Sequence, residues 1–172
     1  IIDDSDNIYV ASTSRSNNFP TSTNAFDRFN NGEEDAVVFK LTPTANNLIW
    51  ATYIGGDATE AAFSLKLDSD NNPYVVGMTS GSDFPFSPRG LNQTFQRVGS
   101  EGFVVHLGRN GDRILNATYL NRSDFAYFVE LDSDGQVYVV GQSSSGNYPV
   151  TGGVYSNPRS TMFLHKLNPE LS

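Results

Sequence analysis

Short apolar runs alternate with polar, turn-forming stretches along the whole chain. The runs hold about five to eight residues and are rich in Val, Ile, Tyr and Phe, while Gly, Asn, Asp and Pro crowd the stretches between them. Stable helices need longer segments, and Gly and Pro interrupt the pattern between runs. The chain is therefore predicted to be all β.

The order of the runs repeats along the chain. One stretch, LDSDNNPYVVGMTSGSDFP, returns as LDSDGQVYVVGQSSSGNYP and, in a more divergent form, as IDDSDNIYVASTSRSNNFP; the copies occupy residues 67–85, 131–149 and 2–20. Corresponding tyrosines lie 65 and then 64 residues apart, at Tyr9, Tyr74 and Tyr138. A period of this length indicates a repeated structural unit rather than a repeated turn.

Four apolar segments recur in the same order. In the first unit they occupy residues 8–12, 36–41, 48–56 and 61–68, in the second 74–77, 102–107, 114–122 and 126–132, and in the third 137–141 and 162–167. Each reads as one short strand. Long loops rich in Asn, Ser and Thr, residues 15–34 and 78–100, follow the first segment of the first two units.

Four short strands per unit are typical of the blades of a β-propeller, which pack face to face. Runs such as YVV and FVV are apolar at consecutive positions, which indicates strands buried on both faces. The units run approximately over residues 1–65, 66–129 and 130–172, and the last is incomplete. Because closed propellers have about four to eight blades, residues 1–172 are predicted to be about three consecutive four-stranded antiparallel blades of a larger propeller.

The missing blades are expected from the rest of a longer chain or from another polypeptide, since edge strands left unpaired are prone to aggregate.

The repeated phrases resemble a known family. D-S-D-G-x-V-Y-V-V-G, an aromatic residue before Pro, F-V-x-x-L and A-T-Y-[IL] follow one another in the order of the bacterial β-propeller repeat called SBBP. The likeness covers the whole chain and departs at Asn121-Arg122, where the first unit has Gly55-Gly56. It implies a propeller of about seven blades in a large secreted or surface-displayed bacterial protein, commonly beside adhesive or sorting domains. It implies no catalytic residues.

Composition narrows the classes of partner. Asp and Glu number 19 against 11 Lys and Arg, which gives a formal net charge of -8, and the basic residues are scattered. Such a surface should repel nucleic acid and anionic lipid headgroups, so we expect no nucleic-acid partner and no direct membrane insertion. Cysteine is absent, which removes disulfides and thiolate metal sites.

The acidic phrases at 68–71 and 132–135 allow two interpretations. Alternate carboxylates could converge on a calcium ion. Asp, Ser, Asn and Gly are also the residues of a tight turn, through side-chain to backbone hydrogen bonds and tolerance of positive φ. The later ligands of an EF-hand loop are missing. We favour the turn and predict no metal site.

Neither histidine is predicted to be catalytic. His106 stands where the other units have lysine, and His165 stands where they have Phe or Val; those residues are Lys40, Lys166, Phe39 and Val105. G-x-S-x-G and phosphate-binding glycine loops are both absent from the sequence. We therefore predict no catalytic and no cofactor-binding residues.

Aromatic residues offer two further alternatives. Trp50 could stack on a sugar at an exposed edge, but an aromatic residue within an apolar strand is usually part of the core. The aromatic-proline pairs, Phe19-Pro20, Phe84-Pro85 and Tyr148-Pro149, are expected to pin the long loops to the blades through ring burial and the fixed φ of proline. The hydroxyl of Tyr148 would then need a hydrogen-bond partner.

The sequence favours a non-enzymatic module, extracellular or on the outer cell surface of a bacterium, that presents loops 15–34 and 78–100 to a protein partner. One alternative is a carbohydrate-binding or polysaccharide-processing propeller, in which soluble glycans would change the fluorescence of Trp50. Another is a structural subunit of a larger surface assembly. Sequons begin at Asn92, Asn116 and Asn121, and chance matches are the favoured interpretation.

Overall fold

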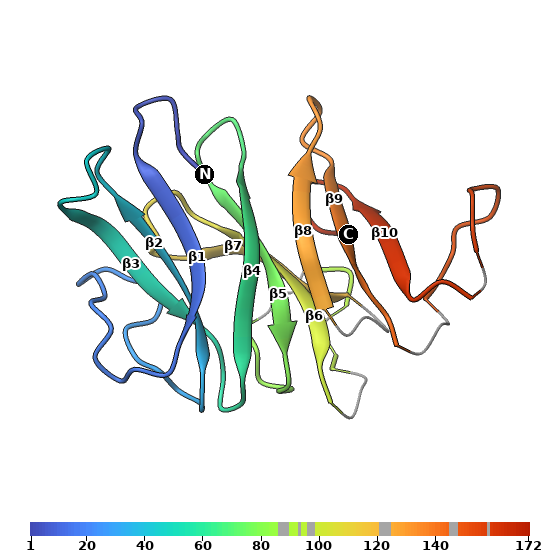
Figure 1. The fold of residues 1–172 in the computed structure, drawn as a ribbon, viewed down its shortest axis with the longest axis horizontal. Helices are drawn as coiled ribbons and strands as arrows, with labels where there is room; N and C mark the ends of the chain where they lie inside the picture. Colours follow the sequence, from blue (N-terminus) through green and yellow to red (C-terminus); the bar gives the residue numbers. More distant parts are fainter. Residues whose placement is uncertain (86–89, 93, 96–98, 121–124, 145–147, 158) are drawn as a thin grey trace.

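In the part of the chain that the structure describes, antiparallel sheets form and there are no helices. The structure is a computed structural model that describes residues 1–85, 90–92, 94–95, 99–120, 125–144, 148–157 and 159–172. Among them, ten strands form three sheets (Figure 1). The strands are β1 (Ile8–Ser14), β2 (Asp35–Leu41), β3 (Leu48–Ile54), β4 (Glu60–Leu67), β5 (Pro73–Thr79), β6 (Glu101–Leu107), β7 (Ile114–Leu120), β8 (Phe125–Leu131), β9 (Val137–Gln142) and β10 (Met162–Leu167). The all-β prediction is confirmed.

Each sheet is an antiparallel meander in which neighbours in sequence are neighbours in space. The first sheet is β1-β2-β3, the second is β4-β5-β6-β7, and the third is β8-β9-β10. The fourth segment of each repeat unit, which becomes β4 or β8, opens the next sheet and does not close its own. The sequence period and the sheets are thus offset by one strand.

The three sheets pack face to face. One apolar cluster joins the first and second sheets, and its largest side chains include Tyr9, Trp50, Phe103 and Tyr119. A second cluster joins the second and third sheets. The middle sheet is therefore covered on both sides, and all seven residues of β6 are buried. This explains why its sequence is apolar at consecutive positions.

β4 is an edge strand of the second sheet and β8 an edge strand of the third, and they lie on the same side as β1, an edge strand of the first sheet. We call this side of the three sheets the inner edge. β4 packs against both β1 and β8, and β8 packs against β5. β3 and β7 close the opposite, outer edges of the first two sheets (Figure 1). In both inner strands the register shifts by one residue, between Ala62 and Ser64 and between Ala126 and Phe128. Phe63 and Tyr127 are thus the extra residues of two equivalent β-bulges.

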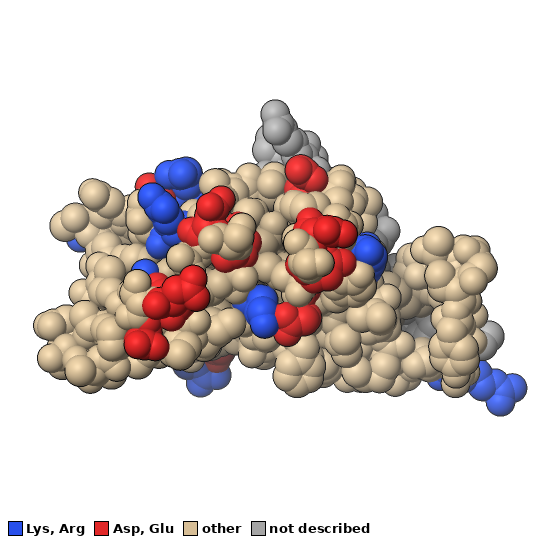
Figure 2. Space-filling view, turned by 90° about the horizontal axis from the view of Figure 1, so that it is seen from above, with Lys and Arg blue, Asp and Glu red and all other residues tan. Residues whose placement is uncertain are grey.

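The two ends of the sheets differ. Tight turns before β1, β5 and β9 lie at the upper end in Figure 1, which we call the turn end. They contain residues with positive φ at equivalent positions: Asp6 at 60°, Asn71 at 62° and Gly135 at 75°. The loops that follow β1 and β5 lie at the opposite end, which we call the loop end. Figure 2, seen from the turn end, shows several separate groups of acidic side chains with basic ones between them.

Candidate functional site

The acidic phrases form turns, as the favoured interpretation predicts. Asp68 Oδ1 accepts hydrogen bonds from the backbone N–H groups of Asp70 at 2.9 Å and Asn72 at 2.8 Å. Asp132 accepts the same pair of bonds in the third unit. The turn interpretation is confirmed. Within the part of the chain that the structure describes, no three His, Cys, Asp or Glu side chains are grouped so that they could hold a metal ion.

The first aspartate of each turn also faces a basic side chain on the second strand after the turn, which is β2, β6 or β10. The pairs are Lys40 with Asp3 at 2.9 Å, His106 with Asp68 at 3.1 Å and Lys166 with Asp132 at 3.8 Å. Each basic side chain lies over the ring of the repeated tyrosine. Lys40 Nζ lies 4.7 Å from the ring centroid of Tyr9, and Lys166 Nζ lies 5.0 Å from that of Tyr138. The ring centroids of His106 and Tyr74 are 3.9 Å apart. We call each set of three the turn triad. His106 thus occupies the lysine position, as the alignment predicts.

Electrostatics differ between the copies of the turn triad. Burial by itself would raise the pKa of Asp3, but its hydrogen bonds, first that from Lys40 and then those from Asn7, hold the pKa well below its usual range. In the second copy, burial lowers the pKa of His106 below 6.5, and Asp68 offsets only part of this. The second triad is therefore the one copy whose basic member is uncharged at pH 7 in the folded chain, because the pKa of His106 lies below 6.5.

The aromatic-proline pairs pack on the sheets in all three units. Phe19 contacts Phe39 and Tyr53, and Phe84 stacks on Phe103 with a centroid distance of 4.4 Å. In the third unit, Tyr148 stacks on the ring of Phe163, and its hydroxyl lies 2.5 Å from His165 Nδ1. The pinning of the loops and the need of Tyr148 for a partner are both confirmed.

Trp50 is a core residue. Only 5% of its surface is exposed, and it packs edge-on against Tyr9 in the first cluster. A Cβ atom on Gly111, in the turn between β6 and β7, would lie 2.4 Å from the Trp50 ring. The core interpretation is confirmed, and Trp50 does not form an exposed sugar platform.

The Ala-Thr-Tyr phrase of β3 holds the long loop that follows β1. The N–H of Asp27 donates to Thr52 Oγ1 at 3.0 Å, and the N–H of Tyr53 donates to the carbonyl of Asp27 at 3.0 Å. Ser22 makes a further pair of bonds with Ala51, in which each residue donates its backbone N–H to the other. The loop thereby follows the outer edge of β3 as an irregular extra strand.

The same clamp recurs in the second sheet. The N–H of Asn92 donates to Thr118 Oγ1 at 2.8 Å, and the N–H of Tyr119 donates to the carbonyl of Asn92 at 3.1 Å. We call the Thr-Tyr pair of the strand and its loop residue, Asp27 or Asn92, the loop clamp. Sequence reasoning treated A-T-Y as a strand motif and missed this role; the recurrence of a threonine within an apolar strand was the available signal.

Each clamped loop also reaches the neighbouring sheet. The N–H of Phe26 donates to the carbonyl of Gly111 at 2.8 Å, and the N–H of Leu91 donates to the carbonyl of Leu171 at 2.8 Å. Both acceptors lie at positive φ in equivalent turns, at 66° and 63°. The described parts of the long loops are therefore held by two sheets and present their exposed side chains on a fixed backbone.

Exposed side chains of loop 15–34 form the surface best suited to recognition. Phe29 is 65% exposed, and Arg28 and Asn31 beside it are also exposed. Aromatic and arginine side chains are enriched at protein interfaces. Residues 86–89, 93 and 96–98 of loop 78–100 lie outside the described residues. We call residues 28–31 the loop patch.

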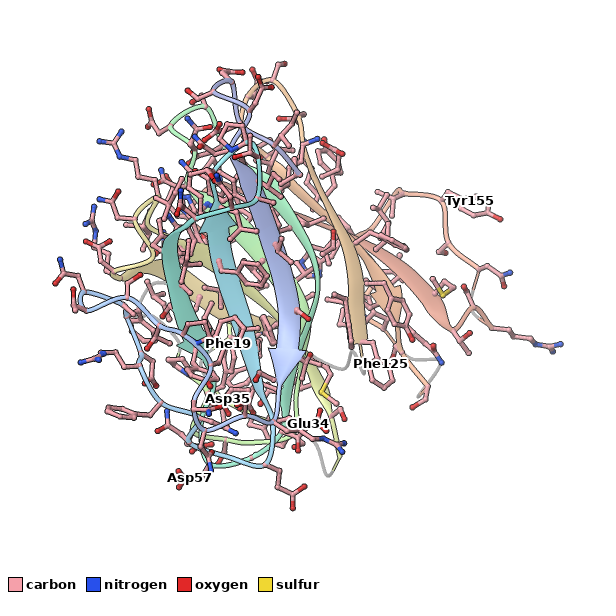
Figure 3. All side chains as sticks on the ribbon, turned by 60° about the vertical axis from the view of Figure 1, so that its left-hand side comes forward. Phe19, Glu34, Asp35, Asp57, Phe125 and Tyr155 are labelled. Carbon is pink, nitrogen blue, oxygen red and sulfur yellow. The ribbon has the colours of Figure 1, made fainter. Side chains whose placement is uncertain are left out.

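Two carboxylates are buried at the loop end, where Figure 3 labels Asp35. Asp35 and Glu60 are both 0% exposed, and they open β2 and β4. A Cβ atom on Gly55 would lie 2.5 Å from Asp35 Cγ and 2.7 Å from Glu60 Oε2. This close approach explains one glycine of the Gly55-Gly56 pair. Sequence analysis did not single out either carboxylate.

Both buried carboxylates accept hydrogen bonds. Asp35 accepts from the backbone N–H groups of Asn31 and Gly32. Glu60 accepts from the hydroxyl of Thr79 at 2.7 Å and from the N–H of Gly56 at 2.8 Å. Burial raises the pKa of Glu60, and repulsion from Asp35 adds to the increase. Burial likewise raises the pKa of Asp35. The carboxylates belong to the interior of the loop end rather than to its surface.

Three aromatic rings meet at the inner edge. Phe63 of β4 lies 6.3 Å from Phe125 and 5.9 Å from Tyr127 of β8, and those two rings are parallel within 6°. Phe63 is 43% exposed. Sequence reasoning missed this cluster, which we call the inner aromatic cluster, because two of its members are bulge residues.

The sequons differ in their surroundings. Asn92 belongs to a loop clamp, and Asn116 lies within β7 opposite His106. Asn121 lies outside the described residues. No helix in the described part of the chain is long and apolar enough to cross a membrane.

Comparison with known proteins adds no relative. No protein-family model and no curated protein matches the sequence.

Proposed function

We propose that the chain is part of a β-propeller of the SBBP type, and that it serves as a non-catalytic interaction module of a secreted or surface-displayed bacterial protein. In this proposal the propeller has about seven blades, the remaining blades come from the same longer chain, and the partner is a protein at the cell surface. The module uses no cofactor, metal or nucleic acid. The histidines act in packing and in the turn triad.

Support for the propeller comes from the outward face of the third sheet. Tyr138, Val140 and Leu164 lie on this face; the first two are partly exposed, and Leu164 is 67% exposed. The residues at the same positions of the second sheet are at most 2% exposed because the third sheet covers them; they are Tyr74, Val76 and Val104. A face of this composition matches a further sheet of the same repeat, as in a propeller.

Support for recognition comes from the way the loops are held. The loop patch lies on a segment whose backbone is bonded to β3 and to the second sheet. Loops fixed by a rigid scaffold are the usual carriers of binding function. Phe29 and Arg28 offer an apolar anchor and a hydrogen-bonding cation, the combination often found at the centre of protein interfaces.

The experiment is a binding assay on immobilised chain with extracted bacterial envelope and culture-medium proteins, in which the Phe29→Ser variant is compared with the Phe128→Ser variant. The two phenylalanines are 65% and 66% exposed, but Phe128 lies in the third sheet. We expect F29S to lose the bound protein and F128S to retain it. Equal binding by both variants, or retention of signal after the extract is digested with protease, would contradict the proposal.

A second candidate function, carbohydrate binding, is favoured by the inner aromatic cluster. Phe63 is 43% exposed and Tyr127 is partly exposed, so a pyranose could stack on their rings; the Tyr127 hydroxyl already donates to Gln142 at 2.9 Å. Trp50 is too buried to report such binding. Calorimetric titration with soluble oligosaccharides, with Phe63→Ala as the test variant and Phe29→Ala as its control, decides this candidate; heat that F63A abolishes and F29A keeps would support it.

A further inference from the structure

Among the described residues, one edge of the third sheet has no pairing strand, although the equivalent edges of the other two sheets are filled. β10 corresponds to β2 and β6, and of the strands that the structure describes it pairs with β9 alone. In the other two sheets the far side of this strand pairs with β3 or β7. Beside β10 runs a groove of about 570 Å³, lined by β10 itself and by residues of the loop from Tyr148 to Asn157. The groove lies where a fourth strand would lie.

The loop beside this groove carries the residues of a clamp. Counting from the aromatic-proline pairs, Tyr155 corresponds to Phe26 and Leu91, and Ser156 corresponds to Asp27 and Asn92. Tyr155 is 93% exposed, and Figure 3 shows it pointing away from the sheets. The loop half of a clamp is therefore present in the third unit without a Thr-Tyr strand beside it among the described residues.

We propose that β10 and loop 148–157 form an acceptor slot for an extended strand of the Ala-Thr-Tyr-Leu type, supplied by polypeptide outside residues 1–172. The strand would run antiparallel to β10. Its tyrosine N–H would donate to the carbonyl of Ser156, and its threonine hydroxyl would accept the N–H of Ser156, as in the two clamps already formed. The inference rests on the proposed repeat architecture but not on the partner of the loop patch.

The register of the slot follows from the filled sheets. Ala51 and Tyr53 donate their N–H groups to the loop, so Thr52 between them directs its backbone toward β2, where it faces Val38. Leu164 takes the place of Val38 in the third sheet. Its N–H and carbonyl therefore point toward the slot and would bond the incoming threonine.

The probe for the slot is the peptide ILNATYL, the sequence of residues 114–120, with lysines added at its ends for solubility. Titration of the labelled peptide with the 172-residue chain is followed by fluorescence anisotropy. We expect saturable binding that weakens about tenfold in the T118V and Y119A forms of the peptide, because each loses part of the clamp.

Two protein variants test where the peptide binds. Leu164→Pro removes an outward N–H from an edge strand, where proline is tolerated, and should abolish binding. Leu164→Thr keeps the N–H and should bind like the wild type. Ser156→Pro removes the backbone N–H that would donate to the threonine of the peptide and should weaken binding about tenfold. Because Ser156 lies in a loop and not in the sheet, this variant tests the binding site even if L164P does not fold.

Several outcomes would overturn the slot: absence of binding by a monomeric chain, equal binding of all three peptides, or undiminished binding by S156P. Light scattering on the chain alone could also overturn the slot. If the chain is a dimer that the peptide does not dissociate, a second copy of the chain fills the groove. The F29S assay is independent of all these results, so loss of the slot with F29S-sensitive protein binding intact would leave the proposed function standing.

Discussion

Thr52 binds the backbone of Asp27, a residue 25 positions earlier, at both of its polar groups. Its hydroxyl accepts the N–H of Asp27 at 3.0 Å and lies 3.2 Å from the Asp27 carbonyl. The second sheet repeats this relationship between Thr118 and Asn92. A polar residue inside an apolar strand is thus the feature that fixes the course of a twenty-residue loop.

Removal of this hydroxyl should loosen the loop and destabilise the first sheet. The Thr52→Val variant keeps the size and strand preference of the side chain but leaves the partly buried N–H of Asp27 without its acceptor. We expect the free energy of unfolding to fall by about 2 kcal/mol, measured by equilibrium urea denaturation. Thr23→Val, at an exposed loop position, is the control and should change stability by less than about 0.5 kcal/mol. Equal effects would argue against the loop clamp.

The clamp also shows what the sequence alone could predict. The ten strands were predicted to within two residues at each boundary, because apolar runs and turn formers report local structure directly. The partners of A-T-Y were not predicted, because the recurring threonine marks a polar group within an apolar strand but does not indicate which distant loop residue bonds it. Trp50 and the aromatic-proline pairs were predicted correctly because large rings in such positions have few places other than the core.

Two features could not be predicted from the sequence, for different reasons: the strand at which each sheet begins, and the inner aromatic cluster. A repeat has the same period wherever its units are cut, so it does not reveal that β4 joins the sheet of the following unit. Phe63 and Tyr127 were missed because a β-bulge breaks the alternation of faces along a strand.

The second turn triad should make stability depend on pH below 6.5. Burial lowers the pKa of His106 below its ordinary 6.5, so the unfolded chain binds this proton more readily than the fold does. The free energy of unfolding should therefore be highest above pH 6.5 and fall as the pH drops through 6.5 toward the lowered pKa. The His106→Lys variant restores the residue of the other two triads and should reduce this fall, as followed by thermal denaturation between pH 5 and 8.

His165 supplies the internal control for that experiment. Burial lowers its pKa as well, so part of the pH dependence should survive in H106K. Replacement of His165 by Val, the residue of the second unit, should remove the surviving part. A pH profile that neither variant changes would show that the histidines bind protons equally in the folded and unfolded chain.

Gly111 should tolerate substitution far less than Gly135, although both have positive φ. The Gly111→Ala variant combines a left-handed backbone with a Cβ atom 2.4 Å from the Trp50 ring. We expect a loss of about 2–4 kcal/mol, part from the backbone and part from overpacking. Gly135→Asn should cost less than about 0.5 kcal/mol, because Asn71 holds the same conformation in the second unit. Chemical denaturation of both variants measures the difference. Similar losses in the free energy of unfolding would mean that Gly111 has no packing role.

Neutralising Glu60 should not weaken the fold at neutral pH, whereas deleting its side chain should. In Glu60→Gln the amide oxygen can accept from Gly56 and the amide nitrogen can donate to Thr79, so both hydrogen bonds persist without a buried charge. Because burial raises the pKa of Glu60 above 4.5, the fold binds this proton more tightly than the unfolded chain does, and the contribution of Glu60 to stability declines as the pH rises from 4.5 through the raised value. E60Q lacks that decline, so urea denaturation at pH 7 should find it at least as stable as the wild type, while Glu60→Ala should lose about 2 kcal/mol through two unsatisfied groups. If E60Q were as destabilised as E60A, the charge itself would be required, and a cation at this buried carboxylate would become the explanation to test.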